Sequence, residues 1–124
     1  MSGTNLVADT NIILYLFNGD KFIADLLNER QVYISFITEL ELLSYSFMTQ
    51  KDKETIELFL TECSIIDITP AIKSKTIEFR KKYSLKIPDA IVISTAHYLN
   101  LPLITADKAL KKVKDINIIL FEPT

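Results

Sequence analysis

The sequence has almost no cysteine or histidine, and this scarcity excludes several kinds of site. Cys63 is the one cysteine and His97 the one histidine. A lone cysteine cannot close a disulfide within the chain, and a structural zinc site needs about four Cys or His ligands. We therefore expect neither feature, and we expect Cys63 to be a small, buried hydrophobic residue.

Long hydrophobic runs and an excess of positive charge are also missing. No apolar run reaches the roughly 18 residues that a membrane-spanning helix needs, and the segment Met1-Ser2-Gly3-Thr4-Asn5 lacks the pattern of a signal peptide. The formal net charge is −2 and the sequence pI is about 5.4, which argues against a surface that attracts nucleic acid as a whole. We expect a cytoplasmic protein with no membrane partner, whose contacts with nucleic acid are local.

Glycine is scarce too, and no stretch is rich in proline, glycine or serine, so the sequence shows no linker or repeat. What the chain does have is apolar content. Its 124 residues, of which 48% are hydrophobic, are enough to build one sizeable core. We predict a single domain that spans residues 1–124.

Apolar, β-branched runs alternate along the chain with segments of helical periodicity. The runs predict strands at residues 6–8, 31–35, 64–68, 103–105 and 117–121. The periodic segments predict helices at residues 11–17, 22–27, 35–48, 56–63, 70–83, 88–99 and 107–113. We expect Ser35 or Thr38 to cap the third helix, and Thr69 to cap the fifth with Pro70 in its first turn. This alternation predicts an α/β fold, with a mainly parallel sheet of about five strands covered by helices on both faces.

Acidic residues follow several of the predicted strands. In open α/β sheets ligands bind beyond the carboxyl ends of the strands, so acids at these points are candidates for function. The candidates are Asp9, Glu41, Asp89 and Asp107. Carboxylates crowded against apolar residues repel one another unless a cation neutralises them, and hard oxygen ligands favour Mg²⁺ or Mn²⁺. Such a cation can activate water and polarise a phosphoryl oxygen, so hydrolysis of a phosphodiester fits best.

Each of these acids also has an ordinary structural interpretation. Asp89 can be a helix N-cap after Pro88, and Asp107 can cap its own short helix. Glu41 can form a capping box with Thr38. Asp9 has no such routine role beyond a local turn or cap, and we favour function because the four acids occur together.

Four short motifs carrying these acids resemble those of the PIN domain family. They are Val7-Ala8-Asp9-Thr10-Asn11, Ser35 to Leu42, Pro88 to Val92, and Leu103 to Lys108. The resemblance covers nearly the whole chain, and the order of the motifs matches. It implies a three-layer α/β/α fold. Among PIN proteins the compact chain is similar to the VapC-type toxins of bacterial toxin–antitoxin pairs. This similarity implies a Mg²⁺-dependent endoribonuclease that acts on RNA, forms a homodimer and is inhibited by a small antitoxin protein.

The resemblance also implies roles for individual residues. The acidic positions that would bind metal and carry catalysis fall on Asp9, Glu41, Asp89 and Asp107. Asn11 and Thr105 would be polar supports. Ser44 and Ala106 depart from the residues that are common at their positions, but neither removes a carboxylate.

Several other features are less specific. His97 lies roughly 12 Å along one helix from Asp89, so we expect a structural or surface role for it. Basic stretches beside the third and fourth motifs are either RNA contacts or ordinary exposed helix faces: Lys73, Lys75, Arg80, Lys81, Lys82, Lys86, Lys108, Lys111, Lys112 and Lys114. Surplus apolar residues suit either a dimer or antitoxin contact or a plain core: Leu42, Leu43, Tyr45, Phe47, Met48 and Phe59.

Two further functions compete with a toxin nuclease. One is a housekeeping PIN nuclease in RNA processing. The other is a non-catalytic PIN-like scaffold that binds RNA or protein, which the presence of all four carboxylates disfavours. A phospho-receiver domain is set aside, because Asp9 is followed by Thr10 rather than by a second acid.

Overall fold

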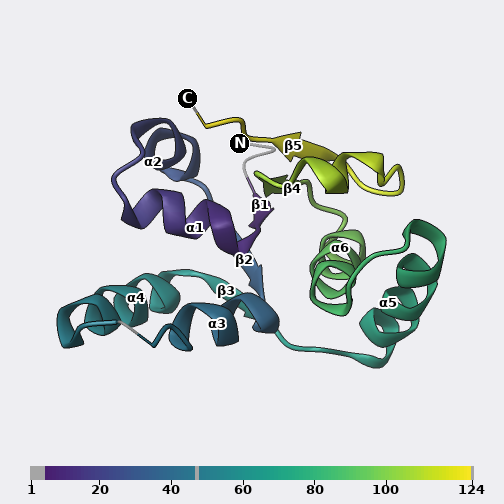
Figure 1. The fold of residues 1–124 in the computed structure, drawn as a ribbon, viewed down its shortest axis with the longest axis horizontal. Coiled ribbons are helices and arrows are strands. Elements are labelled where there is room, and N and C mark those ends of the chain that lie inside the picture. Colours follow the sequence, from purple (N-terminus) through teal and green to yellow (C-terminus); the bar gives the residue numbers. More distant parts are fainter. Residues whose placement is uncertain (1–4, 47, 124) are drawn as a thin grey trace.

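Five short parallel strands form the centre of the fold in the computed structural model, which describes residues 5–46 and 48–123 (Figure 1). Their order in the sheet is β3-β2-β1-β4-β5, and every neighbouring pair is parallel. The strands are β1 (Leu6–Ala8), β2 (Val32–Ser35), β3 (Ser64–Ile66), β4 (Leu103–Thr105) and β5 (Ile118–Leu120). The first strand is therefore central, and the strands beside it are β2 and β4.

Helices fill the connections between the strands. They are α1 (Thr10–Phe17), α2 (Lys21–Leu27), α3 (Phe36–Leu43), α4 (Gln50–Glu62), α5 (Pro70–Tyr83), α6 (Ile87–Leu99) and the 3-10 helix η1 (Lys108–Lys112). No helix in the part of the chain that the structure describes is long and apolar enough to cross a membrane.

Successive side chains along the strands point to opposite faces of the sheet, and helices cover both faces, which gives three layers. Leu6 and Ala8 of β1 belong to a core shared with α1, α2 and α4, whereas Val7 between them belongs to a second core shared with α5 and α6. In β4, Ile104 and Leu103 divide between the two cores in the same way. In Figure 1 the helices α1 and α2 lie on one side of the sheet, and α5 and α6 lie on the other. The predicted α/β class, the five-stranded parallel sheet and the helical cover on both faces are confirmed.

Three predicted boundaries were wrong. The helix expected over residues 35–48 ends at Leu43, because Ser44 caps it with its N–H on the Glu41 carbonyl and its hydroxyl on the Leu40 carbonyl. Phe47 lies outside the described residues. The third strand ends at Ile66 rather than at residue 68, and the helix expected over residues 56–63 begins earlier, at Gln50, because Thr49 caps it there.

The predicted caps are present. The Ser35 hydroxyl accepts a hydrogen bond from the Ile37 N–H at the start of α3. The Thr69 hydroxyl accepts one from the Ile72 N–H at the start of α5, with Pro70 in the first turn. These two caps place the starts of α3 and α5 just after β2 and β3, since proline and a capping hydroxyl both suit a first helical turn.

Cys63 and His97 both contribute to packing. Cys63 is half-buried rather than fully buried, because it follows the end of α4, and burial raises the pKa of its thiol to about 11. The His97 ring packs edge-on against Phe79 with centroids 5.3 Å apart. This contact agrees with the expected structural role of His97.

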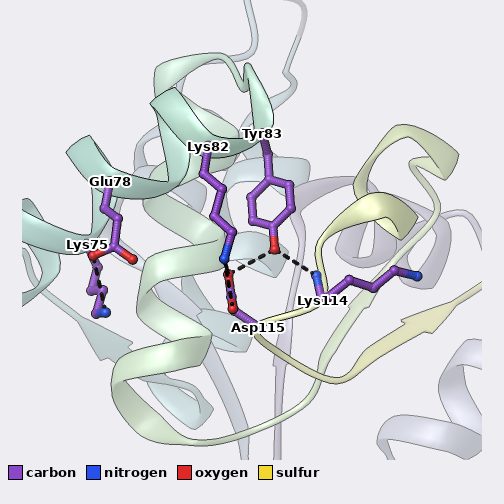
Figure 2. A network of polar contacts seen from close by, with 6 residues as sticks. All are labelled: Lys75, Glu78, Lys82, Tyr83, Lys114 and Asp115. Carbon is purple, nitrogen blue, oxygen red and sulfur yellow. Dashed lines mark hydrogen bonds and ion pairs between the residues drawn. The ribbon is translucent and has the colours of Figure 1, made fainter.

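A polar network joins the end of α5 to the loop before β5 (Figure 2). Asp115 accepts hydrogen bonds from the Tyr83 hydroxyl at 2.9 Å and from the Lys82 ammonium at 3.1 Å. The Tyr83 hydroxyl also accepts one from the Lys114 N–H at 3.1 Å. The bonds from Tyr83 and Lys82 hold the pKa of Asp115 below its ordinary value. Two lysines of the basic stretch on α5 therefore have acidic partners within the chain: Lys82 binds Asp115, and Lys75 forms an ion pair with Glu78 on the same helix.

Phe79 and Ile77 test whether α5 packs as described. Phe79 is 1% exposed, whereas Ile77 on the same helix is 59% exposed. Phe79→Ala should lower the free energy of unfolding by about 3–5 kcal/mol, because it removes a buried ring and leaves a cavity. Ile77→Ala, the matched control, should change it by no more than about 0.5 kcal/mol. Urea denaturation followed by circular dichroism measures both, and equal effects would contradict this packing.

Candidate active site

One pocket at the carboxyl edge of the sheet contains all four predicted carboxylates. Asp9 follows β1, Asp107 follows β4, Glu41 lies on α3 after β2, and Asp89 lies in the first turn of α6. Parallel strands bring these segments to the same edge. The pocket has a volume of about 250 Å³, and its lining residues are Asp9, Thr10, Asn11, Leu14, Glu41, Tyr45, Pro88, Asp89, Val92 and Asp107.

Asp9 is held at both carboxylate oxygens. Its Oδ1 accepts a hydrogen bond from the Thr10 N–H at 2.9 Å, and its Oδ2 accepts one from the Thr105 hydroxyl at 2.7 Å. Burial raises the pKa of the Asp9 carboxyl above its ordinary value; these two bonds oppose the shift, and repulsion from Asp89 and Glu41 adds to it. Asp9 is therefore a fixed, partly desolvated carboxylate.

Thr105 and Asn11 connect the ends of β1 and β4. Thr105 is fully buried, and its hydroxyl accepts a hydrogen bond from the Asp107 N–H at 3.1 Å while it donates to Asp9. The Asn11 side-chain oxygen accepts one from the Ala106 N–H at 3.5 Å. The two polar residues that the sequence predicts as supports thus lie beside the acids.

Glu41 reaches the pocket from the exposed surface of α3. Its Oε1 accepts a hydrogen bond from the Thr10 hydroxyl at 2.5 Å. It does not form a capping box with Thr38, because Ser35 caps α3 and Thr38 is fully buried within the helix. The capping interpretation of Glu41 is therefore wrong.

Asp89 and Asp107 differ in their local roles. Lys86 occupies the N-cap of α6, so the interpretation of Asp89 as that cap is wrong. Burial raises the pKa of Asp89, repulsion from Asp107 and Glu41 adds to the shift, and Lys86 opposes it. Asp107 does cap η1, since its Oδ1 accepts a hydrogen bond from the Ala109 N–H at 2.9 Å, and it lines the pocket as well.

The pocket suits a hard divalent cation by the chemistry of its donors. Carboxylates and a side-chain amide line it, and these are the oxygen ligands that Mg²⁺ and Mn²⁺ prefer. Burial raises the pKa of Asp9 and Asp89, and the mutual repulsion that adds to this shift is relieved by positive charge. In residues 5–46 and 48–123, no group of three or more His, Cys, Asp or Glu side chains is arranged to hold an ion. The donor atoms are thus of the type that the cation prefers, but the described side chains are not arranged around one position as a complete set of ligands.

Two threonines were missed as site residues. Thr10 bonds both Asp9 and Glu41, and its hydroxyl lies 3.1 Å from that of Thr38. The position of Thr10 directly after Asp9 was a usable signal. The contact with α3 was not predictable from local pattern, because it joins residues 31 apart in sequence.

An apolar groove adjoins the pocket, and Leu14 and Tyr45 line both. The groove has a volume of about 450 Å³ and lies between α1, the segment before α4, and α4; its remaining lining residues are Phe17, Asn18, Met48, Lys51, Asp52, Thr55 and Ile56. Of the surplus apolar residues, Leu42 is fully buried in the core, whereas Leu43 and Tyr45 are exposed. Phe59 packs against Phe17 with ring centroids 5.4 Å apart.

Known structures share this architecture. A toxin–antitoxin complex from Klebsiella pneumoniae includes a chain of 29% identity and TM-score 0.81, with 92% of this chain and 95% of that chain covered. VapBC-1 from nontypeable Haemophilus influenzae matches with 25% identity and TM-score 0.75, covering 94% and 97%. VapBC2 from Rickettsia felis, bound to a DNA fragment from their promoter, has 21% identity and TM-score 0.81, covering 95% and 99%, which shows the fold alone.

Sequence comparison identifies the family. No curated protein matches the chain at a significant level. The sequence model of the PIN domain matches residues 6–116, which include all four candidate carboxylates and every strand up to β4. The resemblance predicted from the four motifs is confirmed: this chain belongs to the PIN domain family.

Proposed function

We propose that this chain is a Mg²⁺- or Mn²⁺-dependent endoribonuclease that hydrolyses RNA phosphodiester bonds, and that it is the toxin of a toxin–antitoxin pair. The observation that carries the proposal is one pocket lined by Asp9, Glu41, Asp89 and Asp107, which come from four separate segments of a PIN domain. Burial raises the pKa of Asp9 and Asp89, and repulsion within this set adds to the shift, which suits a site that binds a cation.

The four carboxylates would hold the metal and orient the reacting groups. A divalent cation held there would supply an activated water molecule and a Lewis acid for the phosphoryl group. Thr105 and Thr10 fix the two oxygens of Asp9, so this ligand is ordered before substrate arrives. Leu14 and Val92 give the pocket an apolar wall, which strengthens electrostatic interactions inside it.

RNA binding would be local, in keeping with the net charge of −2. Lys86 is exposed at the start of α6, and its charge acts on Asp89. An ammonium group at the rim of the pocket can bind a phosphate next to the cleaved one, and such contacts position the backbone without reading its sequence.

An antitoxin is the partner that we propose for the apolar groove. Two of the similar structures come from toxin–antitoxin complexes in which the matching chain is at least 25% identical. Leu14 and Tyr45 line both the groove and the pocket, so a segment bound in the groove would reach the carboxylates and block them. A homodimer stays a prediction from the resemblance.

Removal of the Asp9 carboxylate should slow cleavage strongly, and removal of the metal should stop it. We expect purified protein to cut a mixed RNA pool with Mg²⁺ or Mn²⁺, and EDTA to stop it. Asp9→Asn should lower the rate by more than about 100-fold, because it removes a ligand rather than its support. Asp25→Asn, an exposed acid on α2, is the matched control and should retain full activity. Cleavage that survives both EDTA and Asp9→Asn would rule out this chemistry.

Loss of the Thr105 hydroxyl should weaken catalysis without removing any carboxylate. Thr105→Val preserves shape but leaves Asp9 Oδ2 and the Asp107 N–H without this partner. We expect kcat/KM to fall by about 10–100-fold, as for partners of metal ligands. Thr76→Val removes a buried hydroxyl from α5, away from the pocket, and should leave kcat/KM unchanged. Wild-type kinetics for Thr105→Val would show that Asp9 needs no such support.

Growth of a bacterial host separates a toxin from a housekeeping nuclease. Induced expression of the chain should halt growth, because RNA cleavage outside cellular control stops protein synthesis. Asp89→Asn should permit growth at equal expression, whereas Asp25→Asn should still halt it. Normal growth with an active wild-type enzyme in the cells would favour a housekeeping role in RNA processing.

A further inference from the structure

The Glu41 side chain needs a contact that holds it in place in the pocket. It is exposed on α3, and a free glutamate side chain samples several rotamers. A ligand or base must instead be held within a fraction of an ångström of its working position. The hydrogen bond of 2.5 Å from the Thr10 hydroxyl is the contact that restrains it. Hydroxyl–carboxylate bonds of this length are charge-assisted and among the stronger ones.

Thr10 is itself well placed to provide that restraint. It is the first residue of α1, so the end of the central strand β1 fixes its backbone. As a β-branched residue it has few side-chain rotamers. Its hydroxyl lies 3.1 Å from that of Thr38, which is fully buried. The Thr10 hydroxyl is therefore anchored on one side by the protein interior.

The number of available protons gives the direction of the hydrogen bonds among Thr38, Thr10 and Glu41. A hydroxyl has one proton, and a carboxylate can only accept. Thr10 therefore donates to Glu41, and its oxygen can accept from Thr38. Thr38 lies one helical turn before Glu41 on the same face of α3, so both ends of the contact belong to one helix.

Thr10 also contacts the other carboxylate beside it. Its backbone N–H donates to Asp9 Oδ1 at 2.9 Å, while its side chain donates to Glu41. One residue thus contacts two acids: Asp9 directly before it, and Glu41, which lies 31 residues further along the chain. A mutation of its side chain affects only the second of these bonds, which makes the two contributions separable.

We propose that Thr10 is a positioning residue, whose hydroxyl, backed by buried Thr38, holds Glu41 in the pocket beside Asp9. This inference rests on the proposed nuclease function for its catalytic consequence, but the restraint on Glu41 can be measured without it. Thr10 acts through Glu41 and needs no contact with substrate.

The test uses the full chain with three single variants. Thr10→Val removes the hydroxyl, Thr10→Ser retains it, and Thr95→Val removes a buried hydroxyl that bonds the Ile91 carbonyl on α6. Thr10→Val should lower kcat by about 10–100-fold with KM little changed, and Thr10→Ser should restore most of the activity. Thr95→Val should behave as wild type. A wild-type rate for Thr10→Val, or failure of Thr10→Ser to restore activity, overturns the proposal.

A double variant distinguishes action through Glu41 from a general structural effect. Adding Thr10→Val to Glu41→Gln should lower the rate no further than Glu41→Gln alone, because the group that Thr10 positions is already lost. A further drop of the same size as in the wild-type background overturns the proposal.

A measurement on the protein alone keeps the inference separate from nuclease activity. NMR relaxation of the Glu41 side chain should show restricted motion in wild type and in Thr10→Ser, and free rotamer exchange in Thr10→Val. If wild type cleaves no RNA yet shows this pattern, the proposed function fails and the positioning role stands. Equal mobility of Glu41 in all three proteins overturns the positioning role.

Discussion

The site depends on one partly buried charge, the Asp9 carboxylate at the end of the central strand. A carboxylate removed from water is costly unless hydrogen bonds compensate for the lost hydration. Thr105 on the neighbouring strand and the Thr10 N–H provide those bonds, one to each oxygen. Because Thr105 also binds the Asp107 N–H, the group that stabilises Asp9 fixes the loop that carries the next acid.

Crowding of negative charge follows from this arrangement. The parallel sheet brings the segments after β1, β2 and β4 to one edge, and α6 adds Asp89 from its first turn. Burial and mutual repulsion raise the pKa of Asp9 and Asp89. Keeping these carboxylates charged and close together therefore costs the folded protein free energy. Stability alone does not require such a cost, since apolar residues would fill the same space more favourably. A bound cation is the simplest way to offset it.

The sequence predicted whatever depends on local pattern. Apolar, β-branched runs between segments of helical spacing located the five strands. The acids that follow the strands were placed at the correct edge of the sheet. Contacts between distant segments could not be predicted from the sequence, because no local pattern indicates that Thr10 contacts Thr38 and Glu41. The early end of α3 was missed for a related reason, because apolar residues continue past Leu43 while the Ser44 cap ends the helix.

The most direct test of a cation-binding carboxylate site is anomalous diffraction from crystals of the protein soaked in Mn²⁺. We expect an anomalous peak in the pocket, within about 2.0–2.4 Å of oxygens of Asp9 and Asp89, because Mn²⁺ scatters anomalously and binds the same hard ligands as Mg²⁺. Asp9→Asn crystals should lose that peak. No peak in the pocket in crystals of protein that cleaves RNA, or a peak that persists in Asp9→Asn, would contradict the account.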